Sequence, residues 1–133
     1  GLAAALDHLA HEFTEHSATP VHFSALGNTE GLPHVANTVL FRIAQEALTN
    51  VERHAHAHRI DMALVRKGKT MTLTVRDDGS GFDSKRVALH PKRGIGLRNM
   101  MERMDAIGGR LDIASSTAGT LVKASMEIDG LKS

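Results

Sequence analysis

Residues 41–50 read FRIAQEALTN, and apolar residues recur there at three- and four-residue intervals. The spacing extends from Pro33 to about Ala55, and proline is tolerated in the first turn of a helix. The stretch therefore predicts a long, packed helix. Glu46 and Asn50 are four residues apart, so they share one helix face. A carboxylate there needs a partner or a ligand, unless both side chains lie on the solvated face.

The segments around this helix alternate between helical and strand patterns. Between Gly79 and Gly94 the chain mixes glycine, proline and charged residues, which predicts a long surface loop of the kind that serves as a lid. The other predicted elements are a helix over 2–13, strands over 21–25, 59–65 and 70–76, a helix from 97 to 107, and strands over 110–115 and 120–128. The fold class is therefore α+β, a two-layer α/β sandwich with about three helices packed on a mostly antiparallel sheet.

Composition limits the classes of protein to which the chain can belong. The chain has 133 residues, 41% of them hydrophobic, which suits a single domain over 1–133. A formal charge of +1 gives no reason to expect binding to nucleic acid or to a membrane surface. The absence of cysteine excludes disulfides and thiolate metal sites.

Targeting signals are also missing from the sequence. No apolar run approaches the roughly 20 residues that span a bilayer, and the first residues lack the pattern of a signal peptide. We therefore expect a cytoplasmic domain without direct membrane contact. Because the helical pattern begins at the first residues, we also expect this domain to be excised from a longer protein.

A second polar motif, Asp77-Asp78-Gly79-Ser80-Gly81, directly follows a predicted strand. Gly79 and Gly81 allow the backbone to turn sharply and to approach a ligand closely. The alternative is an ordinary surface turn, because Asp-Gly is a common turn pair.

Two glycine motifs come later in the chain. Gly94-Ile95-Gly96-Leu97 precedes a predicted helix, so its backbone N–H groups and the positive end of the helix dipole are available to a phosphate. The alternative is a flexible linker before a helix start. Gly119-Thr120 is less specific, because Thr120 also fits the start of the last strand.

The order of these four motifs resembles the ATP-binding domain of sensor histidine kinases, which has the Bergerat fold also found in DNA gyrase and MutL. Three phrases are closer still: residues 41–50, residues 76–82 (RDDGSGF) and residues 96–103 (GLRNMMER). They resemble the nitrate-sensor and DesK-like subfamily, which pairs with LuxR-type response regulators.

The resemblance implies that the chain binds ATP with Mg²⁺. It implies that Asn50 supplies an oxygen to Mg²⁺, that Glu46 is the catalytic residue that orients or deprotonates the attacking group, and that Asp77 accepts a hydrogen bond from the adenine amino group. The other implied nucleotide-binding residues are Arg53, His54, Gly79, Gly81, Gly94, Ile95, Gly96, Leu97 and Thr120.

The implied reaction is transfer of the γ-phosphate of ATP to a histidine on a separate dimerisation domain of the same kinase, in two-component signal transduction. A LuxR-type response regulator is the indirect partner. We expect this fragment to be monomeric and the full-length kinase to be a homodimer. Two alternatives are another Bergerat-fold ATPase, such as an anti-sigma-factor serine kinase, and a non-catalytic nucleotide-binding interaction module.

Overall fold

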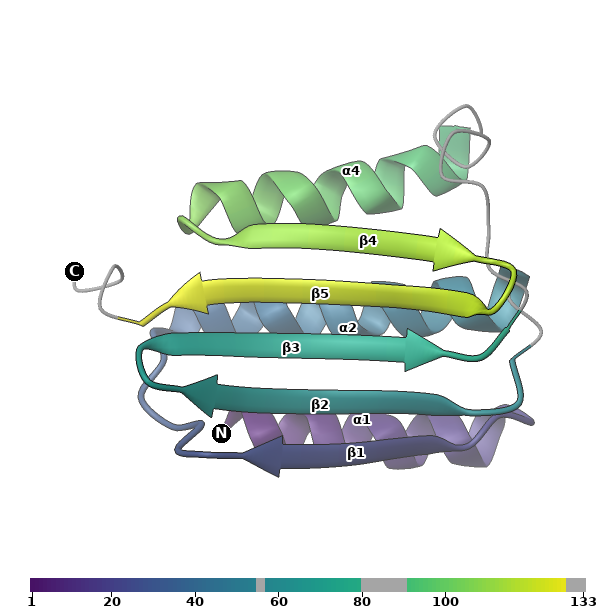
Figure 1. The fold of residues 1–133 in the computed structure, drawn as a ribbon, viewed down its shortest axis with the longest axis horizontal. Helices are drawn as coiled ribbons and strands as arrows, with labels where there is room; N and C mark the ends of the chain where they lie inside the picture. The colour runs from purple at the N-terminus through teal and green to yellow at the C-terminus, as the bar shows by residue number, and fades with distance from the viewer. Residues whose placement is uncertain (55–56, 80–90, 129–133) are drawn as a thin grey trace.

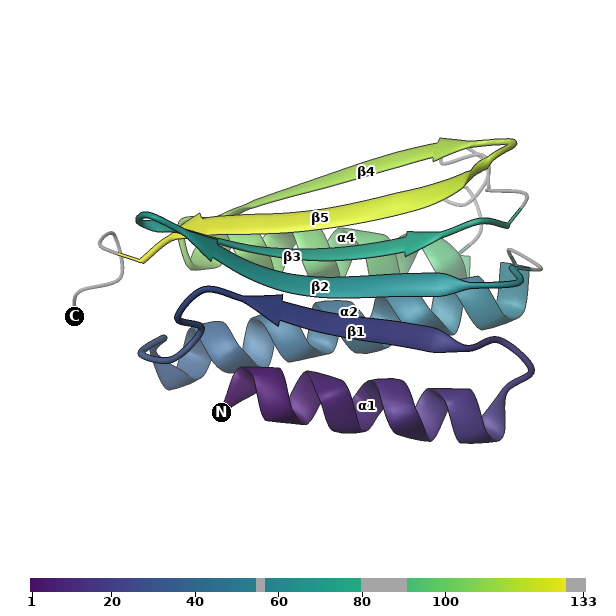
Figure 2. The same ribbon diagram turned by 60° about the horizontal axis from the view of Figure 1, so that its bottom comes forward.

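The computed structural model describes residues 1–54, 57–79 and 91–128, and only the backbone of 53, 54, 91–95, 97 and 98. In this part of the chain three helices lie against one face of a five-stranded sheet (Figures 1 and 2). In chain order the elements are α1 (Leu2–His16), β1 (Val21–Leu26), α2 (His34–His54), β2 (Ile60–Lys67), β3 (Thr70–Asp77), α4 (Pro91–Ala106), β4 (Arg110–Ser116) and β5 (Gly119–Glu127). The predicted two-layer α+β sandwich is confirmed.

The strands are ordered β1-β2-β3-β5-β4. β1 pairs with β2 in parallel, and the other three pairs are antiparallel. The prediction of a mostly antiparallel sheet is confirmed. β2 and β3 form a hairpin whose turn contains Gly68 at a φ of 62°. Asp77, at the end of β3, pairs with Ile60 on one side and with Thr120 of β5 on the other.

The hydrophobic core lies between the sheet and the helices. Alternate residues of each central strand point inward, as the period of a strand requires, and α2 packs in the middle of the helical layer against α1, α4, β3 and β5. Each fully buried leucine or isoleucine contributes about 1.5–3 kcal/mol. The largest fully buried side chains are Leu6, Leu40, Ile43, Leu48, Ile60, Met62, Leu64, Met71, Leu73 and Met104. No helix in the described residues is both long enough and apolar enough to cross a membrane.

The start of α4 differs from the prediction. The helix begins at Pro91 and contains Gly94 and Gly96, whereas the sequence predicted a glycine loop that leads into a helix near Leu97. Proline fixes a φ that suits the first helical turn, and this outweighs the glycines that were interpreted as loop signals. Residues 80–90, most of the predicted lid, lie outside the described part.

Candidate functional site

The predicted site residues come from four elements that meet at one end of the molecule. The C-terminal end of β3 carries Asp77, and the N-terminal end of β5 carries Thr120. The last turns of α2 carry Asn50, and the first turns of α4 carry Gly96. Both views show these four ends on the same side, at the right of Figures 1 and 2. Motifs far apart in the sequence are therefore neighbours in the fold.

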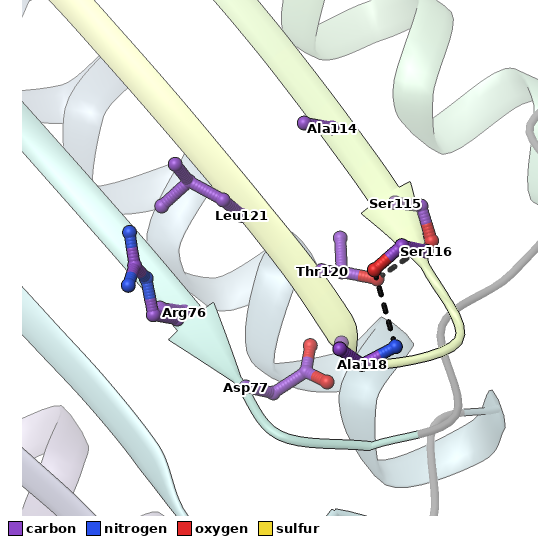
Figure 3. Close-up of a pocket in the computed structure, with 9 residues that line it drawn as sticks. Arg76, Asp77, Ala114, Ser115, Ser116, Ala118, Thr120 and Leu121 are labelled. Atoms are coloured by element: carbon purple, nitrogen blue, oxygen red, sulfur yellow. Dashed lines mark hydrogen bonds between the residues drawn. The ribbon is translucent and has the colours of Figure 1, made fainter.

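Asp77 and Thr120 form the centre of this end. They are the buried polar residues of the described core, 5% and 6% exposed, and they face each other as cross-strand partners. The Asp77 carboxylate accepts the Gly79 backbone N–H at 2.9 Å and a further hydrogen bond from the Thr120 backbone. The Thr120 hydroxyl lies 3.0 Å from the Ser115 hydroxyl (Figure 3). A polar cluster thus closes one end of an apolar core.

Burial raises the pKa of Asp77, and hydrogen bonds from the backbone of Gly79 and Thr120 lower it in part. A carboxylate has about four lone-pair positions, so the two backbone donors found among the described residues leave acceptor capacity unused. A buried carboxylate with unused acceptor positions is costly in free energy unless a ligand donates hydrogen bonds to it, and such groups cluster at functional sites. Asp77 therefore has the properties of a ligand-binding acceptor.

A pocket of about 280 Å³ adjoins this cluster, close to the lower size limit of small-molecule sites. It is formed mainly by the hairpin between β4 and β5, together with the end of β3 (Figure 3). Arg76, Ala114 and Leu121 alternate with the core-facing residues of their strands, so the pocket reaches the open face of the sheet. Its lining residues are Arg76, Asp77, Ala114, Ser115, Ser116, Ala118, Gly119, Thr120 and Leu121.

Gly119 permits the close approach of β5 to Asp77. Its φ is 136°, a conformation that residues with a side chain rarely adopt, and a Cβ atom there would overlap the Asp77 carbonyl oxygen. In the sequence this glycine belonged to the less specific of the two later glycine motifs. In the structure it allows β5 to lie close enough to β3 for Asp77 and Thr120 to pair across the strands.

A second hollow, of about 190 Å³, lies between α2 and α4. Glu46 lies on its wall, half-buried, and a Cβ atom on Gly96 would overlap the Glu46 Oε1 atom. Gly96 therefore allows α4 to pass close beside the Glu46 carboxylate. The residues that line this hollow are Arg42, Ile43, Gln45, Glu46, Thr49, Gly96, Asn99, Met100 and Arg103.

The structure gives less detail about the other candidate residues. Asn50 is half-buried near the end of α2, and Gly79 is buried beside Asp77. Gly81 lies outside the described residues. The backbone of five further candidates lies in the last turn of α2 or the first turns of α4, at the same end of the molecule: Arg53, His54, Gly94, Ile95 and Leu97. Their roles stay predictions.

Sequence reasoning missed Ser115, whose hydroxyl contacts Thr120. A signal was present, because Leu111, Ile113 and Ser115 share the inward period of β4 and the hydroxyl occupies a position where an apolar residue is expected. Sequence reasoning also assigned no role to Asp78. Its carboxylate accepts hydrogen bonds from the backbone N–H groups of two residues that precede β2.

A family profile described as histidine kinase-, DNA gyrase B- and HSP90-like ATPase matches residues 36–129. The chain belongs to this family. The matched stretch runs from the start of α2 past the end of β5, so it contains all the candidate site residues. The family binds ATP.

Curated relatives narrow the assignment. The sensor histidine kinase MctS of Rhizobium johnstonii is 44% identical over 126 residues, which cover 95% of this chain and 27% of the relative. The signal transduction histidine-protein kinase/phosphatase DegS of Brevibacillus brevis is 32% identical over 130 residues, covering 96% and 33%. This chain thus spans a third or less of the length of these relatives. The predicted relationship to sensor histidine kinases is confirmed, and the pairing with LuxR-type regulators stays a prediction.

Solved structures agree on the fold. The histidine kinase domain of a blue-light activated histidine kinase from Erythrobacter litoralis superimposes with a TM-score of 0.77, covering 98% of this chain and 62% of that chain. The two sequences are 24% identical. The likeness shows that the arrangement of helices on the sheet is that of a histidine kinase domain.

Proposed function

We propose that this chain is the catalytic, ATP-binding domain of a sensor histidine kinase. It binds ATP with Mg²⁺ and donates the γ-phosphate to a histidine on the dimerisation domain of the same kinase. The observation that supports this most strongly is the buried Asp77–Thr120 pair, at the end where the family's motifs converge. A buried acceptor with spare capacity is suited to the amino group of adenine, and it discriminates strongly against a base that lacks this donor.

The proposed pose follows from the four elements. The adenine amino group donates to Asp77, with Gly79 and Thr120 beside it, while the phosphates extend toward Asn50 and the first turns of α4. Mg²⁺ usually takes one or two protein oxygens and completes its shell with phosphates and water, so the Asn50 amide suffices as a protein ligand. The N-terminus of α4 adds the positive end of its dipole on the phosphate side. Phosphoryl transfer then depends chiefly on positioning and charge neutralisation.

The partners in this proposal belong to the whole kinase. The acceptor histidine lies on the dimerisation domain, which also makes the full-length protein a homodimer, and a LuxR-type response regulator receives the phosphoryl group afterwards. The supporting fact is that this chain matches only part of each longer sensor kinase.

The experiment that tests the proposal is transfer of ³²P from ATP to the separately supplied dimerisation domain of the parent kinase. We expect an acid-labile phosphohistidine, and Asn50→Ala is expected to slow its formation by at least about 100-fold, because a metal ion contributes several kcal/mol of charge stabilisation. Asn37→Ala is the matched control, since Asn37 is also half-buried on α2 but near its other end. Asn37→Ala should transfer phosphate at the wild-type rate.

Three outcomes would contradict the proposal in whole or in part. An acid-stable phosphoserine would indicate a serine kinase of the same fold. Binding of ATP without any transfer to the dimerisation domain would indicate a nucleotide-binding module that has no kinase activity. Equal losses in Asn50→Ala and Asn37→Ala would remove Asn50 from the metal site.

The contact between Glu46 and Gly96 gives a further prediction. In Gly96→Ala the new methyl group would displace the Glu46 carboxyl group, which is the far end of a flexible side chain. Alanine is favoured over glycine inside a helix by about 1 kcal/mol, so the free energy of unfolding should change little or rise. If Glu46 orients the attacking group, phosphotransfer should nevertheless fall by about tenfold or more.

A double-variant comparison isolates this effect. In the Glu46→Ala background, Gly96→Ala should have no further effect on the rate of phosphotransfer, because the displaced group is already absent. The two rates and the urea denaturation curves are measured on the same preparations. Additive losses of rate would mean that Gly96 acts on transfer without Glu46.

A further inference from the structure

Asp78 connects the loop after β3 to the segment before β2. One oxygen of its carboxylate accepts the backbone N–H of His58 at 2.8 Å and that of Arg59 at 3.0 Å. The backbone N–H of Asp78 donates to the Arg59 carbonyl oxygen at 3.3 Å. These three bonds continue the pairing of β2 and β3 by one step beyond the Ile60–Asp77 pair.

The two segments that Asp78 joins both belong to the candidate site. Asp77 and Gly79, on either side of Asp78, form the turn in which the Asp77 carboxylate accepts the Gly79 N–H. His58 and Arg59 lie on the connection between α2, which carries Asn50, and β2. Asp78 therefore links the Asp77–Gly79 turn, which contains the proposed adenine acceptor, to the segment between α2 and β2. The helix α2 carries Asn50, the proposed metal ligand.

The strength of this link comes from charge. The hydrogen bonds from the backbone of Arg59 and His58 hold the pKa of Asp78 below its usual value, so the carboxylate is ionised at neutral pH. Hydrogen bonds to an ionised acceptor are about twice as strong as neutral ones. Asp78 is exposed to solvent, and its carboxylate contacts backbone N–H groups in place of a ligand. Its position therefore suits a residue that acts through its neighbours.

We propose that Asp78 is a positioning residue of the nucleotide site, which holds the Asp77–Gly79 turn in the shape that directs the Asp77 carboxylate at the bound base. This inference rests on the proposed function, because it takes ATP to be the ligand. A recognition group must be held to within about 0.5 Å to be effective, and the supporting hydrogen bonds provide that precision.

The test compares four variants by calorimetric titration with ATP and with purine riboside triphosphate, which lacks the adenine amino group. Asp78→Ala should weaken ATP binding by about three- to tenfold, the equivalent of one hydrogen bond, and should reduce the preference for ATP. Asp78→Asn should restore part of both, because its neutral amide oxygen can accept the same two N–H groups in weaker hydrogen bonds. Asp78→Ser, with a shorter acceptor, should lie between them and serves if Asp78→Ala does not fold.

Asp61→Ala is the matched control. Asp61 is an exposed aspartate that also contacts Arg59, but through the guanidinium group at 3.0 Å. Its removal deletes the same charge from the same neighbourhood and leaves the backbone link intact. We expect its affinity for ATP and its base preference to stay within about twofold of the wild type, as for surface substitutions.

The possible outcomes separate the two claims. A folded wild type that binds no nucleotide would overturn the proposed function and this inference with it. Wild-type binding with an unchanged base preference in both Asp78→Ala and Asp78→Ser would overturn only the positioning role. Equal losses in Asp78→Ala and Asp61→Ala, or no rescue by Asp78→Asn, would also overturn it.

Discussion

Asp77→Asn is expected to weaken ATP binding by about 100-fold, because the loss of a charged hydrogen-bond acceptor costs up to about 3 kcal/mol. The reason is the arrangement of hydrogen-bond donors around the Asp77 carboxylate. The Asp77 carboxylate accepts hydrogen bonds from the backbone of Gly79 and Thr120, and the proposed adenine amino group is a third donor. Asparagine has one acceptor oxygen and an NH₂ group. Whichever way its amide turns, the NH₂ group faces a donor.

Asp77→Asn should weaken ATP binding without a comparable loss in the free energy of unfolding. Burial raises the pKa of Asp77 above its usual 3.8, so the folded protein binds this proton more tightly than the unfolded chain does. The stabilisation that protonation provides is complete below pH 3.8 and is lost as the pH rises through the raised pKa. As the pH rises from 3.8 through the raised pKa of Asp77, the wild type loses this stabilisation and Asp77→Asn does not. The free energy of unfolding of Asp77→Asn should therefore increase relative to that of the wild type as the pH rises.

Calorimetry with two ligands makes the test specific. Wild type should prefer ATP to purine riboside triphosphate, while Asp77→Asn should bind both with similar, weak affinity. Urea denaturation of both proteins from pH 3 to pH 7 measures the stability difference. If Asp77→Asn keeps its preference for ATP, Asp77 does not contact the adenine amino group.

Gly119→Ala is expected to lower the free energy of unfolding by roughly 2–4 kcal/mol and to weaken ATP binding as well. A side chain at a φ of 136° is strained by about 1–3 kcal/mol, and its Cβ atom would overlap the Asp77 carbonyl oxygen. Because that oxygen belongs to the backbone, it cannot rotate away as a side chain can. The ends of β3 and β5 must separate, and the Asp77–Thr120 pair separates with them.

Gly108→Ala is the matched control for this prediction. Gly108 also has a positive φ, 75°, but a Cβ atom there would have open space around it. It should therefore show the strain alone, about 1 kcal/mol, and unchanged affinity for ATP. Urea denaturation of both variants measures the loss of stability, and ATP titration measures the loss of affinity. Equal costs in the two variants would mean that the approach of β5 to Asp77 is unimportant.

The periodicity of the sequence predicted most of the fold, because helices and strands bury one face each and their patterns are local. The strands of the β2–β3 hairpin and the span of α2 were expected to within about two residues at each end. The start of α4 was missed because glycine indicates a loop locally, whereas contact with Glu46 favours glycine inside this helix.

The site was predicted in its residue types but not in its geometry. Asp77 and Thr120 were both named from their motifs, yet their pairing depends on the register of β3 against β5, which is set by the whole sheet. The contacts of Ser115 and Asp78 also join segments that are separate in the sequence. Such contacts leave only weak local signals, so the structure was needed to find them.

The central claim is that the end of the molecule around Asp77 binds ATP. Calorimetric titration of the folded wild-type chain with ATP, with and without Mg²⁺, tests it most directly. We predict saturable binding of one ATP per chain, strengthened by Mg²⁺ and weakened by about 100-fold in Asp77→Asn. A folded chain that shows no binding at millimolar ATP, or binding that Asp77→Asn leaves unchanged, would contradict the claim.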